Sequence, residues 1–162
     1  MKLRIFTTGG TIDKIYFDMK SRYEIGDPQA GDVLQRANVS IEYQIQSILR
    51  QDSLDMNATH RRLIRDTVAA CPERHVIITH GTDTMIETAA VLEEINGKTI
   101  VLTGSMYPAR FHDSDAVFNL GCAVIAAQTL APGVYIAMNG RIFDPRHARK
   151  NVEQNRFEDL ET

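Results

Sequence analysis

The chain has 162 residues, 43% of them hydrophobic, and its 18 basic and 21 acidic residues leave a net charge of -3. This length is typical of one domain with a real core, so we expect residues 1–162 to form a single unit. The charge provides no basic field that could neutralise phosphates, which argues against a nucleic-acid partner and favours a small-molecule substrate.

Five apolar runs are predicted to be β-strands. Residues 3–7 form the first, and residues 41–46 alternate apolar and polar side chains, as in a strand with one wetter face near the edge of a sheet. Residues 76–79, 99–102 and 134–138 are continuous and rich in β-branched side chains, which is typical of central strands covered on both faces.

Three helices are predicted between these strands. Asn57 caps the first, whose expected packing face holds Leu63, Ile64, Thr67 and Val68. Residues 82–84 cap the second, which carries Met85, Ala89, Leu92 and Ile95. The third runs from about Asp115 through Phe118, Cys122, Ile125 and Ala126 and stops near residues 132–133. This alternation predicts βαβ units, with a mostly parallel sheet between two layers of helices.

Residues 12–29 fit neither periodicity, because charged side chains alternate irregularly with Tyr16, Phe17 and Tyr23. A long segment of this kind in a small domain is often functional, and the aromatic residues favour a lid that packs over a site. A surface excursion containing a short hairpin is an equally good interpretation.

Two hydroxyl-bearing turns directly follow predicted strands, at residues 8–11 and 80–84. The carboxyl ends of parallel strands share one edge of a sheet, where open α/β folds bind their ligands. Thr11 in the first turn and Thr82 and Asp83 in the second are therefore expected to converge. Gly10 and Gly81 would let the backbone approach a substrate closely. The alternative for Thr11 and Asp83 is a structural role as a turn or helix cap.

The cysteines and histidines point to neither a disulfide framework nor a metal centre. Cys71 and Cys122 lie in apolar helical patterns, which fits reduced cysteines in a cytoplasmic protein, and the first apolar run is too short for a signal peptide. His75 and His80 flank one strand without a third ligand at useful spacing. We therefore expect no metal and no cofactor.

Four ordered motifs resemble the bacterial-type L-asparaginases: residues 8–12 (TGGTI), 52–57 (DSLDMN), 79–85 (THGTDTM), and Met138-Asn139 leading to Lys150. The resemblance spans nearly the whole chain. It implies a three-layer α/β sandwich of the Rossmann or flavodoxin-like kind, matching the large N-terminal domain of that family. Typical members are about twice as long, so this chain is similar to short forms without the C-terminal domain.

The resemblance implies that Thr11 is the acyl-forming nucleophile of an L-asparaginase, and that Thr82, Asp83 and Lys150 form a triad. A lysine accepts a proton only when its amine is neutral. Asp83 would pair with the ammonium of L-asparagine. Ser53 and the backbone amides after Asn57 would receive its carboxylate. Lys150 would otherwise be a solvated surface lysine.

Two differences from the longer enzymes concern the substrate pocket. Leu54 stands where they carry a glutamine next to the serine, and the acidic residue that their second domain lends to a neighbouring site has no counterpart in this sequence. Weaker substrate affinity is therefore expected, unless another acid substitutes. Tyr23 is the preferred lid tyrosine, because its spacing before Gly26 is closest to that of the family, with Tyr16 as the alternative.

Other functions remain open at the level of the sequence. The family resemblance does not choose between asparagine and glutamine. A phosphate-binding module is a rival, although the first turn has neither a third glycine nor a P-loop lysine. A non-catalytic regulatory module on the same fold is another. A sheet domain without its usual neighbour is also expected to bury exposed surface by forming a homodimer or tetramer.

Overall fold

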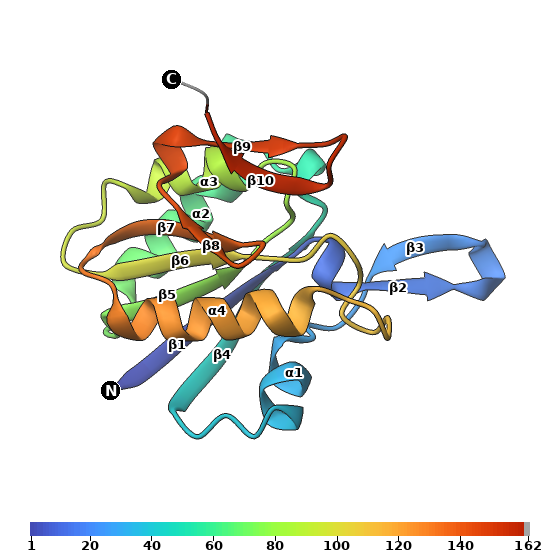
Figure 1. The fold of residues 1–162 in the computed structure, drawn as a ribbon, viewed down its shortest axis with the longest axis horizontal. Coiled ribbons are helices and arrows are strands. Elements are labelled where there is room, and N and C mark those ends of the chain that lie inside the picture. Colours follow the sequence, from blue (N-terminus) through green and yellow to red (C-terminus); the bar gives the residue numbers. More distant parts are fainter. Residues whose placement is uncertain (161–162) are drawn as a thin grey trace.

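The structure is a computed structural model in which residues 1–160 are described, and its centre is a six-stranded sheet (Figure 1). The strand order is β4-β1-β5-β6-β7-β8, in which the first five strands are parallel and β8 is antiparallel. In that order the strands span Glu42–Gln51, Lys2–Gly9, His75–Thr79, Thr99–Thr103, Gly133–Met138 and Arg141–Phe143.

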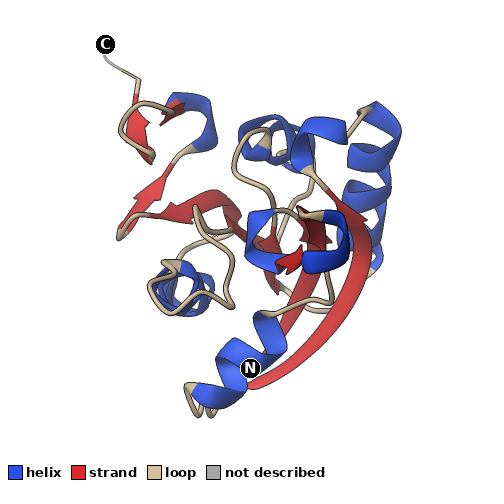
Figure 2. Cartoon of the chain, turned by 90° about the vertical axis from the view of Figure 1, so that its right-hand side faces the viewer, coloured by secondary structure: helices blue, strands red, loops and turns tan. Residues whose placement is uncertain are grey.

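Helices cover both faces of this sheet, as the side view shows (Figure 2). On one face, α1 (Ala30–Arg36) and α4 (Ala116–Thr129) pack on side chains such as Leu3, Ile5 and Ile77. On the other, α2 (Ala58–Ala70) and α3 (Met85–Leu92) pack on Phe6, Ile78 and Leu102. Successive residues of a strand point to opposite faces, so continuous apolar strands feed two separate cores. The predicted three-layer α/β sandwich is confirmed.

The predicted strands and helices all form, with shifted ends. The edge position predicted for residues 41–46 is confirmed, although β4 continues to Gln51, where its last residue pairs with Gly9. The third helix ends at Thr129, before the predicted stop. Helix α1, strand β8 and the hairpin within residues 148–159 were not predicted as defined elements.

Two predicted helix faces were partly wrong. In α2 only Ile64 and Val68 are buried, whereas Leu63 is 47% exposed. In α4 the buried side is made by small residues and Leu120, and both Phe118 and Ile125 face outward. Helix α4 is apolar around most of its circumference, so periodicity could not tell its core side from its solvent side.

Residues 14–25 form a hairpin of β2 (Lys14–Phe17) and β3 (Arg22–Ile25) that projects from the body of the molecule (Figure 1). The short-hairpin interpretation of this segment is thereby confirmed. Its base is tied together by the buried Asp13, whose carboxylate accepts from the Gln29 backbone amide at 2.9 Å. The Asp13 carbonyl accepts from the Gly26 amide at 2.8 Å.

A second hairpin, of β9 (Ala148–Asn151) and β10 (Arg156–Asp159), lies outside the main sheet. A short 3-10 turn, Pro145–His147, leads into it from β8. The hairpin buries Phe157 in the α2/α3 core, where its ring lies 6.2 Å from that of Phe143. This hairpin carries Lys150.

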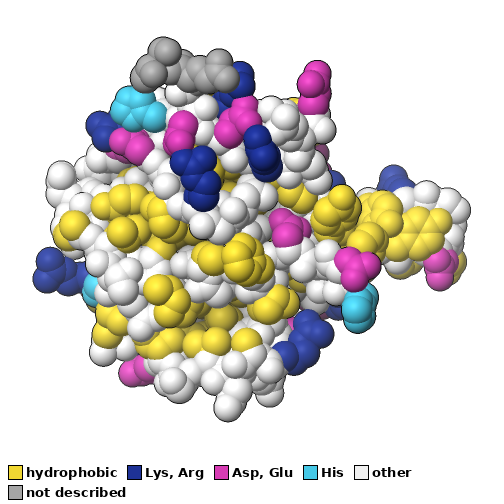
Figure 3. Space-filling model, in the orientation of Figure 1, with side chains coloured by type: hydrophobic (Ala, Val, Ile, Leu, Met, Phe, Trp, Pro, Cys, Tyr) yellow, Lys and Arg dark blue, Asp and Glu magenta, His cyan; other side chains and the backbone are white. Residues whose placement is uncertain are grey.

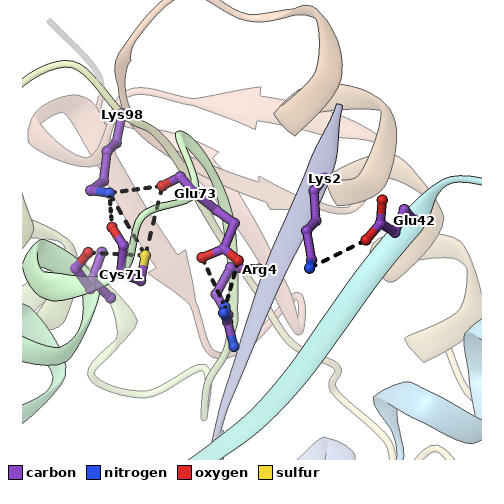
Figure 4. A network of polar contacts seen from close by, with 7 residues as sticks. Lys2, Arg4, Glu42, Cys71, Glu73 and Lys98 are labelled. Atoms are coloured by element: carbon purple, nitrogen blue, oxygen red, sulfur yellow. Dashed lines mark hydrogen bonds and ion pairs between the residues drawn. The ribbon is translucent and has the colours of Figure 1, made fainter.

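A network of polar contacts joins segments at the edge of the sheet where the parallel strands begin (Figure 4). Arg4 binds Glu73 through two hydrogen bonds, of 2.8 and 3.1 Å, and Lys98 donates to the carbonyls of Cys71 and Glu73. These contacts join the end of α2 to the starts of β1, β5 and β6.

Within residues 1–160, none of the helices has both the length and the apolar character needed to cross a bilayer.

Candidate active site

The strand ends that precede the predicted site residues lie side by side. Thr7, Thr79 and Thr103 are register partners on β1, β5 and β6, so the loops that follow these strands leave the sheet at one edge. The Thr8 hydroxyl donates to the Thr79 carbonyl at 2.9 Å and joins the first two strand ends directly. Both threonine turns therefore start from the same place.

Glycines let three turns touch at this edge. Gly10 has a φ of 85°, in the left-handed region, and a Cβ built on it would overlap the backbone nitrogen of Gly81. A Cβ on Gly81 would lie 2.6 Å from the Ser53 hydroxyl oxygen. The structure thus brings the first turn, the second turn and the segment after β4 into direct contact, and a larger residue at either glycine would separate them.

Lys150 reaches this cluster from the β9–β10 hairpin. Its ammonium group donates to the Thr82 hydroxyl at 2.8 Å and to an Asp83 carboxylate oxygen at 2.7 Å. The Lys150 side chain is 16% exposed and that of Asp83 is 39% exposed. The structure therefore joins Thr82, Asp83 and Lys150 by hydrogen bonds, although Lys150 is 67 residues from Asp83 in sequence. At these distances Thr82 can give a proton to Lys150 only when the lysine amine is neutral.

Ser53 opens the short 3-10 turn Ser53–Asp55 beneath the second threonine turn. The residue is buried and, among the described residues, its hydroxyl has no hydrogen-bond partner. Its carbonyl accepts from the Thr84 hydroxyl at 2.8 Å, which fixes Ser53 to the start of α3. An unpaired buried hydroxyl costs free energy unless another group completes it.

Asp52 and Lys14 form an ion pair of 2.8 Å beside Ser53. Burial acts to raise the pKa of Asp52. The hydrogen bonds from Lys14 and the Leu54 amide, with the charges of Lys14 and Lys150, outweigh burial and lower that pKa. Asp52 is therefore ionised, and the pair ties the base of the β2–β3 hairpin to the Ser53 turn.

His80 is completely buried under the second threonine turn. Burial lowers its pKa to about 4, so the imidazole is neutral at physiological pH. Nδ1 lies 2.7 Å from the Gly81 carbonyl, which only accepts, so Nδ1 carries the proton. Nε2 then accepts from the Thr88 hydroxyl at 2.8 Å. A neutral His80 thus fixes the backbone next to Thr82.

The remaining predicted residues differ in their placement. Thr11 begins the 3-10 turn Thr11–Asp13, is partly buried and directly follows Gly10 at the contact with Gly81. Leu54 is 70% exposed next to Ser53. Tyr23 stands apart on the projecting hairpin, where its ring pairs across the strands with Tyr16 at 5.3 Å and contacts Phe111 at 6.1 Å.

Two helix starts differ from expectation. The Asn57 side chain accepts from the amides of Thr59 and His60, so these two of the amides expected to receive the substrate carboxylate are already occupied. Asp83 does not cap α3, because Thr84 holds the N-cap position and its hydroxyl binds Ser53 instead. The cap at Asn57 itself is confirmed, as a capping box with His60.

The contacts made by several residues around the site had no clear signal in the sequence. Lys14, Thr84, Asn119 and Asn139 contact site segments through single hydrogen bonds or ion pairs between distant parts of the chain. Such pairs follow no local periodicity. Thr84 and Asn139 stood in motifs that carry the family resemblance, and Asn139 is also the first residue of an Asn-Gly turn.

The chain is similar in sequence to known proteins. A family profile described as Asparaginase, N-terminal, matches residues 2–159. The chain is 32% identical over 151 residues to an L-asparaginase of Thermococcus kodakarensis, covering 88% of this chain and 45% of that protein. It is 34% identical over 131 residues to a glutaminase-asparaginase of Acinetobacter glutaminasificans, covering 77% of this chain and 38% of that protein.

A solved structure shows the same fold. The thermostable L-asparaginase from Thermococcus kodakarensis superimposes with a TM-score of 0.84 at 30% sequence identity, covering 98% of this chain and 51% of that chain. The chain therefore spans about half the length of the proteins that it matches.

Proposed function

The chain belongs to the asparaginase family, and from this premise we propose that it hydrolyses L-asparagine to L-aspartate and ammonia. The observation that carries the proposal is the Lys150 ammonium group bound to both Thr82 and Asp83 next to the turn of Thr11. Amide hydrolysis needs a nucleophile, a route for its proton, and donors for the developing oxyanion. The cluster supplies side chains for the first two of these needs.

In the proposed reaction the Thr11 hydroxyl oxygen attacks the side-chain carbonyl carbon of asparagine. The C–N bond breaks, the nitrogen leaves as ammonia after taking up a proton, and an aspartyl ester remains on Thr11. Water then attacks the ester, releasing aspartate and restoring the hydroxyl group. We propose that the Thr11 proton passes through Thr82 to a neutral Lys150 amine, and that the resulting ammonium group gives a proton to the leaving nitrogen. Asp83 holds the lysine, and the three groups share hydrogen bonds of 2.7–2.8 Å.

We propose that the substrate is held as a zwitterion. One oxygen of Asp83 is bound by Lys150, so its second oxygen is the proposed partner of the substrate ammonium. The unpaired Ser53 hydroxyl is the proposed donor to the carboxylate. Gly10 and Gly81 keep side chains out of this space. Leu54 adds an exposed apolar contact where a polar one would strengthen binding, which supports the expectation of weak affinity.

The proposal is tested by measuring ammonia released from L-asparagine by the wild type and by Lys150→Met. Removing the amine is expected to lower kcat about 10²–10⁴-fold, the usual contribution of a positioned acid–base group. Lys20→Met is the matched control, because Lys20 is a half-exposed lysine near the tip of the β2–β3 hairpin. Unchanged turnover in Lys150→Met, or no ammonia from the wild type, would contradict the proposal.

A broader glutaminase-asparaginase activity is the second candidate, supported by the resemblance to the Acinetobacter glutaminasificans protein. Parallel assays with L-asparagine and L-glutamine separate the two candidates. The phosphate-binding and regulatory alternatives are less well supported, because neither explains why Lys150 is bound to Thr82 and Asp83.

We also propose that Tyr23 acts as a lid residue after the β2–β3 hairpin moves toward Thr11. We further propose a homodimer or tetramer. Its support is an exposed apolar surface over α4 and β8, where Phe118, Ile125 and Ile142 line a hollow of about 670 Å³ (Figure 3). A cytoplasmic location is proposed from the two free cysteines, Cys71 and Cys122.

A further inference from the structure

The position of Lys150 needs an explanation, because Lys150 lies on a two-stranded hairpin that is not part of the main sheet. Isolated two-stranded hairpins are marginally stable, yet the Lys150 amine is held within 2.7–2.8 Å of two partners. Phe157 lies directly opposite Lys150 in the hairpin register, so the position of β10 sets that of Lys150. The contacts that hold β10 to the body of the protein therefore matter for the site.

The polar contact closest to Lys150 in this register comes from Asn139. The Asn139 side-chain oxygen accepts from the Phe157 backbone amide at 2.8 Å. Asn139 lies in the β7–β8 turn with a φ of 53° and precedes Gly140, whose φ is 75°. The other polar link between β8 and β10, from Arg141 to Asp159, joins two half-exposed side chains and so stabilises the hairpin little.

Asn139 is itself held by a buried side chain. Its backbone amide donates to Asn119 Oδ1 at 3.1 Å, and Asn119 is fully buried in α4. Asn119 Nδ2 donates to the Gly104 carbonyl at 3.1 Å and to Asp115 at 2.8 Å. The turn that carries Asn139 is thus fixed to the loop that leaves β6 at the site edge. The hydrogen bond from the Phe157 amide to Asn139 in turn fixes β10 to this turn.

We propose that Asn139 is a positioning residue, whose side-chain oxygen holds the β9–β10 hairpin so that the Lys150 amine reaches Thr82 and Asp83. The catalytic part of this inference rests on the proposed function. A simpler role for Asn139 is to adopt the left-handed backbone of an Asn-Gly turn, in which asparagine is favoured without any side-chain contact. The two roles predict different behaviour of substituted proteins.

Two substitutions separate these roles. Asn139→Gly keeps the left-handed backbone but removes the acceptor, and Asn139→Asp tolerates the same backbone and keeps an acceptor oxygen. If Asn139 positions Lys150, Asn139→Gly lowers kcat for L-asparagine about tenfold to a hundredfold with little change in KM, and Asn139→Asp restores most of the loss. If Asn139 only shapes the turn, glycine is neutral.

A second measurement does not depend on activity. Limited acetylation followed by peptide mass spectrometry reports how accessible the Lys150 amine is, with Lys20 as an internal reference for an exposed lysine. We expect faster labelling of Lys150 in Asn139→Gly than in the wild type or in Asn139→Asp. Labelling of Lys150 in Asn139→Gly at the wild-type rate would overturn the inference. Faster labelling in a protein that releases no ammonia in any form would refute the proposed function and keep the positioning role.

Discussion

Two buried titratable side chains near the site, Asp13 and His80, have opposite effects on stability. Burial raises the pKa of Asp13 to about 6, against the opposing effects of the Gln29 amide and the Arg50 charge. Its unfolded value is about 4, so the folded state binds more protons between these values. The free energy of unfolding therefore falls as pH rises through this range. His80, with its pKa lowered to about 4, acts the other way and destabilises the fold as pH falls below about 6.5.

Asp13→Asn is expected to remove the loss of stability that Asp13 causes as pH rises. The amide keeps an oxygen that accepts from the Gln29 backbone and stays neutral at every pH. The variant should be more stable than the wild type at neutral pH, by on the order of 1–3 kcal/mol, and this difference should vanish near pH 4. Urea unfolding of both proteins at several pH values measures the difference, from which the His80 contribution cancels. A difference that does not change with pH would contradict this account of Asp13.

Among single residues, those in a local motif could be predicted and those defined by distant contacts could not. Thr11, Thr82 and Asp83 follow strands directly, so the fold alone placed them at one edge. Lys150 could be singled out only through the family resemblance, because its hairpin has no apolar alternation of its own. The hydrogen bond from the Thr84 hydroxyl to the Ser53 carbonyl joins residues 31 positions apart, so no local pattern in the sequence predicts it.

The start of helix α2 was predicted correctly, but the hydrogen-bond partners of its first amides were not. Asn57 caps the helix, as its residue type indicates. The same contact occupies the amides of Thr59 and His60, which a substrate carboxylate would have needed. Sequence alone does not show whether the amides at a helix start are occupied by a cap or free for a ligand.

Asn57→Ala is expected to lower the free energy of unfolding by about 1 kcal/mol, the usual cost of losing an N-cap. The KM for L-asparagine should stay unchanged, since the cap and the proposed substrate contacts at Ser53 and Asp83 are separate. Thermal unfolding and steady-state kinetics of the same preparation check both statements. A lower KM in this variant would instead mean that the released amides bind the substrate.

The β9–β10 hairpin and strand β8 were missed because neither has a strong local pattern in the sequence. Strands β9 and β10 bury only Ala148 and Phe157, one residue in each strand, so their sequences do not alternate as the half-buried strands of a larger sheet do. Strand β8 has only three residues and follows an Asn-Gly turn, the one local signal that could have revealed it.

At the scale of the whole molecule, the sandwich was predictable because five of its six sheet strands carry apolar runs and helices separate most of them. The hydrogen bonds from Lys150 to Thr82 and Asp83 were not predictable, since the lysine comes from a hairpin beyond the last strand of the sheet. The central proposal is therefore that residues from four separate parts of this chain, at Thr11, Ser53, Thr82–Asp83 and Lys150, form a site in which Thr11 is the nucleophile.

That claim is tested most directly by looking for a covalent bond to Thr11. The protein is mixed with L-asparagine, quenched in acid and mapped by peptide mass spectrometry, while ammonia release is followed in the wild type and in Thr11→Ala. We expect an aspartyl ester on Thr11 and no measurable ammonia release in Thr11→Ala. An ester on Thr82 instead, or ammonia release that survives in Thr11→Ala, would contradict it.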